Sequence, residues 1–241
     1  MVDPGEMGIL EHLGELRRRI AISLLGIVIA AIGLYYFSGE IFAFLAVPYR
    51  ETFGSADLIG TGPAEAFLLK LKMAALLGVI VASPLIFYQV WLFVEPGLLQ
   101  EEKKLAVPFV LSTTALFLTG VCFCLYVVFP FAYEFFAKQY ASIAVTPTIK
   151  IQEHLSFVGR GVLAFGVVFE LPILAFFLAR LGLISSQMLV SGFRYALVGI
   201  FALSAVITPP DVITQFLMAA PLCLLYWLSV FIVRTVERRR P

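Results

Sequence analysis

The sequence predicts an all-α polytopic membrane protein with six transmembrane helices, and three observations support this fold class. Hydrophobic residues make up 61% of the 241 residues and charged residues only 14%, whereas soluble domains average about 45–50% apolar and about 25% charged residues. Apolar runs long enough for a bilayer core of about 30 Å recur along the chain. Basic residues gather beside the ends of alternate runs. The net charge of +1 gives no basic signature for nucleic acid.

The predicted spans occupy one membrane domain that includes the whole chain, 1–241, after a disordered leader at 1–7. They cover about 20–37, 67–94, 105–136, 157–181, 195–207 and 212–233. The segments 38–66 and 138–156 are predicted as external caps. The first of them is rich in Gly and Pro, and we expect ordered structure with short helical pieces there. Its last residues, Thr61–Glu65, have the pattern of a helix start, with a hydroxyl before Pro63 and an acid in the first turn.

The fifth and sixth helices are predicted to be short. The fifth would have thirteen residues and end at Thr208-Pro209-Pro210-Asp211, which a helix cannot cross. Such a helix reaches roughly 20 Å, less than the bilayer core. Bilayer thinning or a partner helix would have to compensate for the mismatch.

The distribution of basic residues places both chain ends in the cytoplasm. With the N-terminus inside, eleven of the 17 basic residues lie on the inner side and six on the outer side. The inner set is Arg17, Arg18, Arg19, Lys103, Lys104, Arg180, Arg194, Arg234, Arg238, Arg239 and Arg240. The outer set is Arg50, Lys70, Lys72, Lys138, Lys150 and Arg160. This bias follows the positive-inside rule, and an even number of spans returns the C-terminus to the same side.

The sequence gives no indication of an enzyme. It contains no Walker A loop, HExxH or GxSxG pattern. The three cysteines lie in apolar runs, and the two histidines have no neighbouring metal-ligand pattern. We therefore expect no catalytic residues, metal or cofactor, and any work on a substrate must draw on a partner or on the membrane potential.

Two acid-containing segments lie on the predicted inner side. In the first, Glu11 and Glu15 share one helix face before three arginines. Glu15 either pairs with Arg18 or Arg19 of its own helix or receives a ligand. The second segment, 93–104, contains Glu101 and Glu102 and is either a solvated loop or part of the same surface.

Glu170 is the clearest functional candidate inside a span. An acid at the bilayer centre costs about 2.5–3.5 kcal/mol on insertion scales, so such a residue faces protein or a wet cavity. Pro172 lacks a backbone donor and frees a carbonyl one turn earlier. The alternative is a buried acid that serves only packing. Polar side chains also occur in other spans, at Gln89, Tyr126 and Gln215. The simplest interpretation of each is a hydrogen-bond partner between helices.

Five segments in order make the chain similar to the TatC family, which comprises signal-peptide receptors of the twin-arginine protein translocase. They are HLGELRRR (12–19), TGPAEAF (61–67), FVEPGLLQEEKK (93–104), FELP (169–172) and ITPPD (207–211). The likeness extends from about Gly8 to Arg240. The family often has Glu-Arg-Arg where this chain has Glu102-Lys103-Lys104, which keeps the charge and loses bidentate donors.

The resemblance implies a receptor and assembly platform in the cytoplasmic membrane of a prokaryote, with a concave membrane face. It implies binding of the Arg-Arg signal peptides of folded cargo, single-span partners of the TatA and TatB type, homo-oligomers in the receptor complex, and export driven by the proton-motive force. By residue match, the signal-peptide surface would comprise Glu15, Glu102, Leu16, Arg17, Phe93 and Pro96. The intramembrane and partner-docking residues would be Glu170, Tyr126, Thr208 and Gln215. Pro48, Pro172 and Asp211 would be structural.

Two other functions remain open at this point. A small-solute or ion transporter could use Glu170 as a proton relay, although no internal repeat supports it. A membrane scaffold without a substrate is the other, and the acids on the inner side argue against it. A receptor should distinguish a twin-arginine peptide from a twin-lysine peptide, whereas the alternatives should not.

Overall fold

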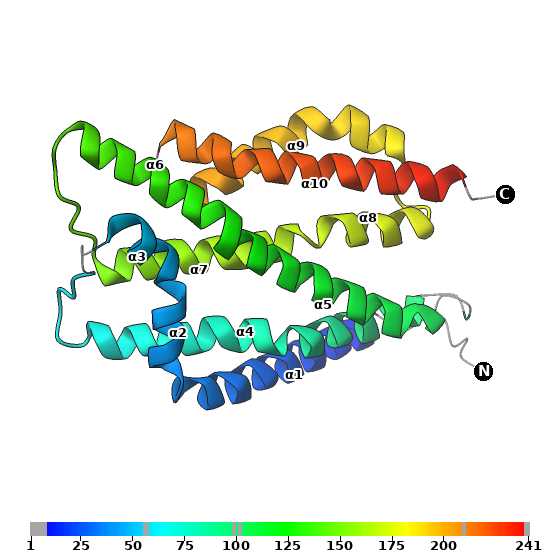
Figure 1. Ribbon diagram of the computed structural model, residues 1–241. Coiled ribbons are helices and arrows are strands. Elements are labelled where there is room, and N and C mark those ends of the chain that lie inside the picture. Colours follow the sequence, from blue (N-terminus) through cyan, green and yellow to red (C-terminus); the bar gives the residue numbers. More distant parts are fainter. Residues whose placement is uncertain (1–8, 55–57, 98–99, 101–102, 209–210, 239–241) are drawn as a thin grey trace. The chain divides into compact units, whose positions relative to one another are not determined.

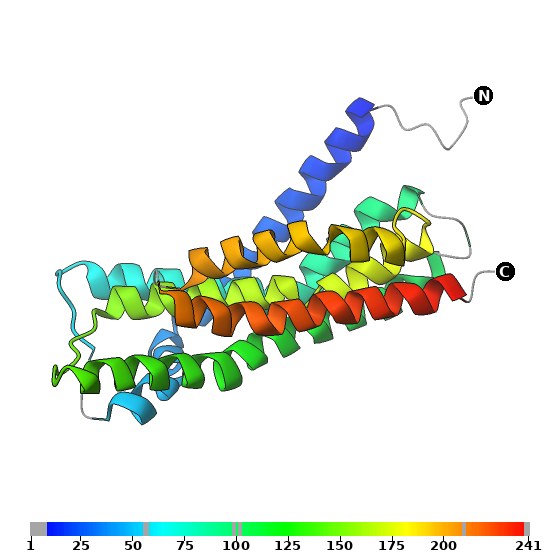
Figure 2. The same cartoon turned by 90° about the horizontal axis from the view of Figure 1, so that it is seen from above.

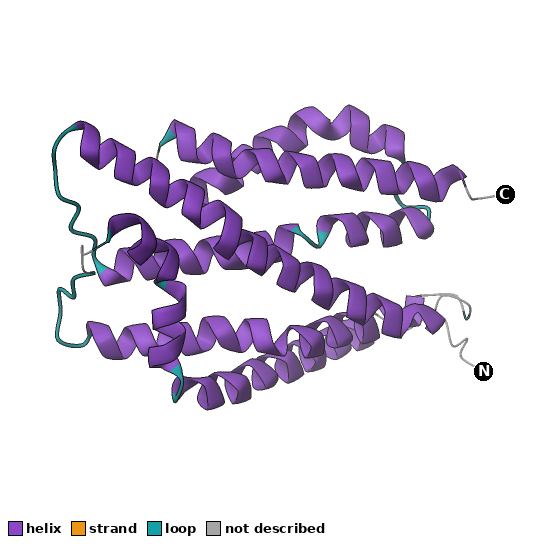
Figure 3. Ribbon diagram, viewed as in Figure 1, coloured by secondary structure: helices purple, strands orange, loops and turns teal. Residues whose placement is uncertain are grey.

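The structure is a computed structural model that describes residues 9–54, 58–97, 100, 103–208 and 211–238. Nearly all of these residues are helical (Figures 1 and 3). Among the described residues, six helical stretches are long and apolar enough to cross a membrane. They are Glu11–Tyr35, Glu65–Gly97, Lys103–Ser142, Ile151–Arg180, Ser186–Ile207 and Val212–Arg238. The predicted all-helical fold with six candidate spans is therefore confirmed.

The chain divides into two compact units. The first comprises residues 1–42 and 66–115, and the second comprises 43–65 and 116–241. The first unit contains α1 (Ile9–Tyr35), most of α4 (Glu65–Val94), the short turns η1 (Glu95–Gly97) and η2 (Lys103–Leu105), and the first half of α5 (Ala106–Phe123).

Close packing of α1 against α4 organises the first unit. A Cβ placed on Gly78 of α4 would lie 2.8 Å from the carbonyl oxygen of Ile27, and Gly26 of α1 faces Leu85. Small residues at such positions let two helix backbones approach in a membrane protein. Because the residue numbers fall along α4 as they rise along α1, the two helices run antiparallel. At the far end of α4, the buried Trp91 packs on Phe109 of α5, with ring centroids 5.0 Å apart.

In the second unit, α5 and α7 (Ile151–Val168) approach so closely that Gly120 and Gly166 leave no room for a side chain. A Cβ on Gly120 would lie 2.5 Å from the carbonyl oxygen of Phe165, and one on Gly166 would meet the ring of Phe117. Between α5 and α6 (Phe129–Ser142) the chain forms a π-helical turn, Cys124–Val128. Such turns interrupt the regular hydrogen-bond ladder and often occur at functional positions.

The expected short helical pieces in 38–66 are confirmed as α2 (Ser38–Leu45) and α3 (Val47–Phe53). The buried Tyr49 of α3 packs on Tyr133 of α6 and on His154 of α7. The Tyr133 hydroxyl and His154 Nδ1 form a hydrogen bond of 2.9 Å. The non-helical connection after α6 is 143–150, shorter than the expected 138–156, and it pairs with Ile59 through a single parallel bridge at Lys150.

The helix start predicted at Thr61–Glu65 is the beginning of α4, and the side chain of Glu65 caps it. The Glu65 carboxylate accepts hydrogen bonds from the backbone N–H groups of Thr61 and Gly62 and from the Thr61 hydroxyl. The amide of Gln152 in the first turn of α7 faces the same carboxylate. One acid thereby connects the beginnings of two helices, whose first amides lack intrahelical partners.

The expectation of short fifth and sixth helices is wrong. Helix α9 (Ser186–Ile207) has 22 residues and α10 (Val212–Arg238) has 27. At 1.5 Å per residue, α9 reaches about 33 Å and can cross a bilayer core of about 30 Å. The predicted α9 began nine residues late because polar residues interrupt the apolar pattern of 186–194. In the structure, the hydroxyl of Ser185 caps the helix by accepting from the Met188 N–H at 3.2 Å. Nothing in its length then requires bilayer thinning.

Helices α8 (Leu171–Arg180), α9 and α10 form a tight group in the second unit. Helix α10 packs against both α8 and α9, and it runs beside α9 in both views (Figures 1 and 2). Tyr226 of α10 donates a hydrogen bond of 2.7 Å to the carbonyl of Leu189 in α9. Val233, Ala175 and Ala179 form a buried apolar contact between α10 and α8.

Candidate functional site

The residues expected to bind a ligand on the inner side lie around the beginning of α1 and the end of α4, in the first unit. We call Glu15, Leu16, Arg17, Phe93 and Pro96 the α1–α4 site. Arg17 and Pro96 are exposed, while Glu15, Leu16 and Phe93 are half-buried. Glu102, expected as the second acid of this surface, lies outside the described residues.

Glu15 pairs with an arginine of its own helix. Its Oε1 accepts a hydrogen bond of 2.9 Å from Nη2 of Arg19, four residues later. Nη1 of the same guanidinium donates to Oε1 of Gln89 in α4, at 3.3 Å. Gln89 is only 6% exposed. The interpretation of Glu15 as paired within α1, and that of Gln89 as an interhelical partner, are both confirmed.

An aromatic contact lies one turn before this network. The imidazole of His12 stacks on the ring of Phe93, with centroids 4.4 Å apart and planes 23° apart. His12, Glu15 and Arg19 are spaced to share one face of α1, and Phe93 and Gln89 are spaced to share one face of α4. The two faces therefore meet in antiparallel register, which sets the carboxylate between an aromatic platform and a buried amide.

The sequence did not point to His12 as a member of this site. Spacing alone allowed Arg18 or Arg19 as the partner of Glu15, and Arg18 is exposed in the structure. Knowing that Arg19 faces α4 requires the register of α1 on α4, which the small residues Gly26 and Gly78 fix.

At the α1–α4 site, the carboxylate of Glu15 binds the guanidinium of Arg19 in partly dehydrated surroundings. The side chains of Glu15 and Arg19 are each 21% exposed. A guanidinium offers donors in a planar fork, which matches a carboxylate better than the single point of an ammonium. The arrangement is suited to selecting arginine over lysine.

Glu170 lies at a break between two helices of one span. Helix α7 ends at Val168, and α8 begins at Leu171 with Pro172 in its first turn. The carboxyl Oε1 is buried and has no hydrogen-bond partner among the described residues, while the backbone of Phe117 approaches the group. The expected interruption of this span by Glu170 and Pro172 is thus present in the backbone.

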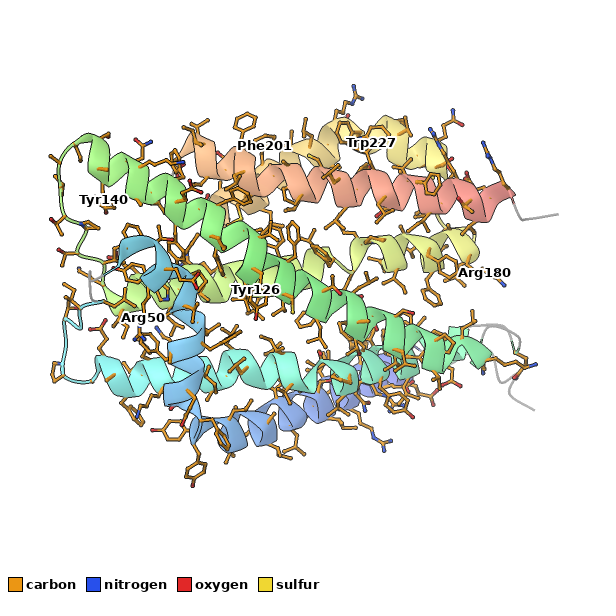
Figure 4. All side chains as sticks on the ribbon, in the orientation of Figure 1. Arg50, Tyr126, Tyr140, Arg180, Phe201 and Trp227 are labelled. Carbon is orange, nitrogen blue, oxygen red and sulfur yellow. The ribbon has the colours of Figure 1, made fainter. Side chains whose placement is uncertain are left out.

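Tyr126 projects from the π-helical turn between α5 and α6 and is labelled in Figure 4. It is 65% exposed, and its ring meets that of Phe44 edge-on, with centroids 6.4 Å apart. Beside it lies a cavity of about 190 Å³ whose lining includes Pro48, Val47 and Pro130. Pro48 occupies the first turn of α3, where its missing N–H costs nothing.

The side chains of Thr208 and Gln215 both donate hydrogen bonds to backbone carbonyls within the second unit. The hydroxyl of Thr208 donates to the carbonyl of Ser204 at 2.9 Å, and the residue is buried. Nε2 of Gln215 donates to the carbonyl of Phe201 in α9 at 2.9 Å (Phe201 is labelled in Figure 4). Gln215 is therefore an interhelical partner, as the sequence suggested. Asp211 accepts hydrogen bonds from the backbone and hydroxyl of Thr214 at the start of α10.

Within the part of the chain that the structure describes, no three His, Cys, Asp or Glu side chains are placed to hold a metal ion. The three cysteines are free. What the structure offers is a guanidinium-binding carboxylate in one unit and an intramembrane acid with an exposed tyrosine in the other.

Comparison with known proteins assigns the family. The family model for the Sec-independent protein translocase protein (TatC) matches residues 11–221. The chain is 42% identical to the Sec-independent protein translocase protein TatC of Helicobacter pylori strain J99, over 94% of this chain and 88% of that protein. It is 41% identical to the TatC of Campylobacter jejuni, over 94% and 93%.

The solved structures agree with this assignment. A crystal structure described as the twin arginine translocase receptor TatC superimposes with a TM-score of 0.88 at 37% identity, covering 95% of this chain and 100% of that one. A second structure, of the receptor in DDM, gives 0.86 at 37% identity. The chain is a multi-pass membrane component of protein transport with bacterial relatives, and it is not an enzyme. The resemblance seen in the sequence is confirmed, and the chain belongs to the TatC family of Sec-independent protein translocase proteins.

Proposed function

We propose that this chain is a receptor for twin-arginine signal peptides of folded cargo, and that it binds them at the α1–α4 site on the cytoplasmic face of the inner membrane. Glu15 would receive one arginine of the pair and Glu102 the other. Leu16, Arg17, Phe93 and Pro96 would shape the surrounding surface. Both chain ends would be cytoplasmic, in keeping with eleven of 17 basic residues on that side.

One observation carries this proposal: the carboxylate of Glu15 already holds a guanidinium, at 2.9 Å. One turn before Glu15 on α1, His12 stacks on the half-buried ring of Phe93. Partial burial strengthens a charge-assisted hydrogen bond relative to one in water. A similar solved protein is described as the twin arginine translocase receptor.

Binding of a fluorescent twin-arginine peptide to the purified protein in nanodiscs tests the proposal. We expect the affinity to fall about tenfold or more for a twin-lysine peptide, and likewise for Glu15→Ala and Glu102→Ala, because charged hydrogen bonds contribute about 1.5–3 kcal/mol. Glu134→Ala is the matched control, since Glu134 forms an i,i+4 pair with Lys138 in an exposed part of α6. Equal binding of both peptides, or unchanged affinity in both acid variants, would refute the proposal.

We further propose that the second unit recruits single-span partners of the TatA and TatB type, with export driven by the proton-motive force. Tyr126 supports this role because it is largely exposed on an irregular turn. Gln215 and Thr208 would act from α10 and from the end of α9, and Glu170 from its helix break. Such groups can form hydrogen bonds with a polar residue of a partner helix within the bilayer.

Co-purification of a tagged single-span partner tests this second part. Tyr126→Ala should reduce recovery of the partner several-fold without changing detergent extraction. Phe131→Ala is the control, because Phe131 is another largely exposed aromatic residue, 56% exposed on α6. Equal recovery with both variants would exclude Tyr126 from the docking surface.

A further inference from the structure

We infer that Arg19 occupies the place of an incoming signal-peptide arginine on Glu15, so that recognition is an exchange of one guanidinium for another. The inference rests on the proposed receptor function and adds a residue that regulates it. It starts from two hydrogen bonds: Arg19 Nη2 to Glu15 at 2.9 Å and Arg19 Nη1 to Gln89 at 3.3 Å.

The guanidinium of Arg19 is held incompletely. Its Nε atom is buried and has no hydrogen-bond partner among the described residues. The bond to Gln89 is near the long limit for an N–H···O hydrogen bond. A buried donor without a partner costs free energy, and this disfavours the arrangement in which Arg19 binds Glu15. Arg19 is therefore bound well enough to occupy Glu15 and poorly enough to be replaced.

Release of Arg19 has a physical route. The residue lies in the first half of α1, directly after the exposed Arg17 and Arg18. A long arginine side chain can extend its charged group into water while its methylenes stay on the apolar surface. A peptide arginine would then take over the carboxylate, and the charge of Arg19 would move to solvent instead of being buried without a partner.

The exchange predicts a change in peptide affinity that a purely structural role of Arg19 does not. If Arg19 competes for Glu15, its removal raises the affinity for the peptide, and it does so only while Glu15 can accept an arginine. If Arg19 merely fastens α1 to α4, its removal weakens the fold and cannot raise the affinity. The sign of the effect, and its dependence on Glu15, separate the two cases.

Affinities of a twin-arginine peptide for four variants in nanodiscs provide the test. We expect Arg19→Gln to bind roughly two- to fivefold more tightly than Arg18→Gln, given the usual strength of partly exposed ion pairs. Arg18→Gln is the matched control because it removes the same charge from the adjacent exposed position. In a Glu15→Gln background, Arg19→Gln should give no gain over Arg18→Gln.

Two further variants keep the test decisive. Arg19→Lys retains the charge, and with it membrane topology, but gives up the fork to Gln89, so it should show a smaller gain in the same direction. Gln89→Leu loosens Arg19 from the other helix and should also give a gain. Affinities for Arg19→Gln equal to or below those of Arg18→Gln would overturn the exchange. If instead Glu15→Gln leaves peptide binding intact, the receptor site itself is misplaced, which is a separate failure.

Discussion

The carboxylate of Glu237, in the last turn of α10, accepts two hydrogen bonds from Ser186, the first residue of α9. The backbone N–H of Ser186 donates to Oε1 at 2.9 Å, and its hydroxyl donates to Oε2 at 2.5 Å. The first amides of a helix have no intrahelical partner, and an acid near that end also complements the helix dipole. Residues 51 positions apart thus cooperate to begin α9.

We predict that Glu237→Ala destabilises the second unit by about 1–2 kcal/mol, because it removes both acceptors from a partly buried helix start. Thermal unfolding in detergent measures the loss, and hydrogen exchange at the first amides of α9 localises it. Glu237→Gln keeps one carbonyl acceptor and should lose less. Unchanged exchange at Ser186 in the alanine variant would show that the helix start does not depend on Glu237.

Asp211 gives a parallel prediction at the start of α10. Its Oδ1 accepts from the Thr214 N–H at 2.7 Å, and its Oδ2 accepts from the Thr214 hydroxyl. Asp211→Ala should lower the free energy of unfolding by about 0.5–2 kcal/mol, the usual contribution of such a cap. Asp211→Asn should restore most of it, because asparagine caps nearly as well. Equal stability of the alanine and asparagine variants would contradict a capping role.

A third prediction concerns the close approach of α5 and α7. In Gly120→Ala the new methyl group would lie 2.5 Å from the backbone oxygen of Phe165, and a backbone atom cannot rotate away. We expect a loss of about 1–3 kcal/mol, as for other overpacked sites. Gly199→Ala is the control, because nothing lies within 4 Å of its Cβ position. That variant should be neutral or up to about 1 kcal/mol more stable. Similar behaviour of the two variants would argue against tight packing at Gly120.

The six spans were predictable because hydropathy and basic-residue placement report directly on the bilayer. The start of α9 was not. Hydropathy placed the start of α9 at Tyr195, whereas the Ser185 hydroxyl and Glu237 begin it at Ser186. A cap supplied by a residue 51 positions away leaves no local pattern. The π-helical turn at Cys124–Val128 lies just before Pro130, but a proline within a helix predicts a kink or break and not this particular turn.

The candidate site was predictable in part for a similar reason. Spacing alone put Arg19 within reach of Glu15, because residues four apart share a helix face. The contacts of Arg19 with Gln89 and of His12 with Phe93 depend on how α1 is seated on α4. That register follows from the approach of two backbones at Gly26 and Gly78, which becomes visible only in three dimensions.

The last prediction concerns water at Glu170. Its carboxyl group is half-buried at the break between α7 and α8, and one of its oxygens has no hydrogen-bond partner among the described residues. An acid within a span is costly unless water or a polar partner reaches it. We expect a locally wet, thinned patch of membrane around Glu170 and Pro172, able to receive a polar residue from a partner helix.

Maleimide labelling of Glu170→Cys checks this expectation in a chain whose Cys122, Cys124 and Cys223 are replaced by alanine. The reaction needs a thiolate, which forms only where water solvates it. Leu224→Cys is the matched control, because Leu224 is 72% exposed in the middle of α10, where it would face lipid tails. Position 170 should therefore label much faster than position 224. Equally slow labelling at both positions would mean that Glu170 lies in a dry environment and serves packing between helices, which would remove it from the proposed docking surface.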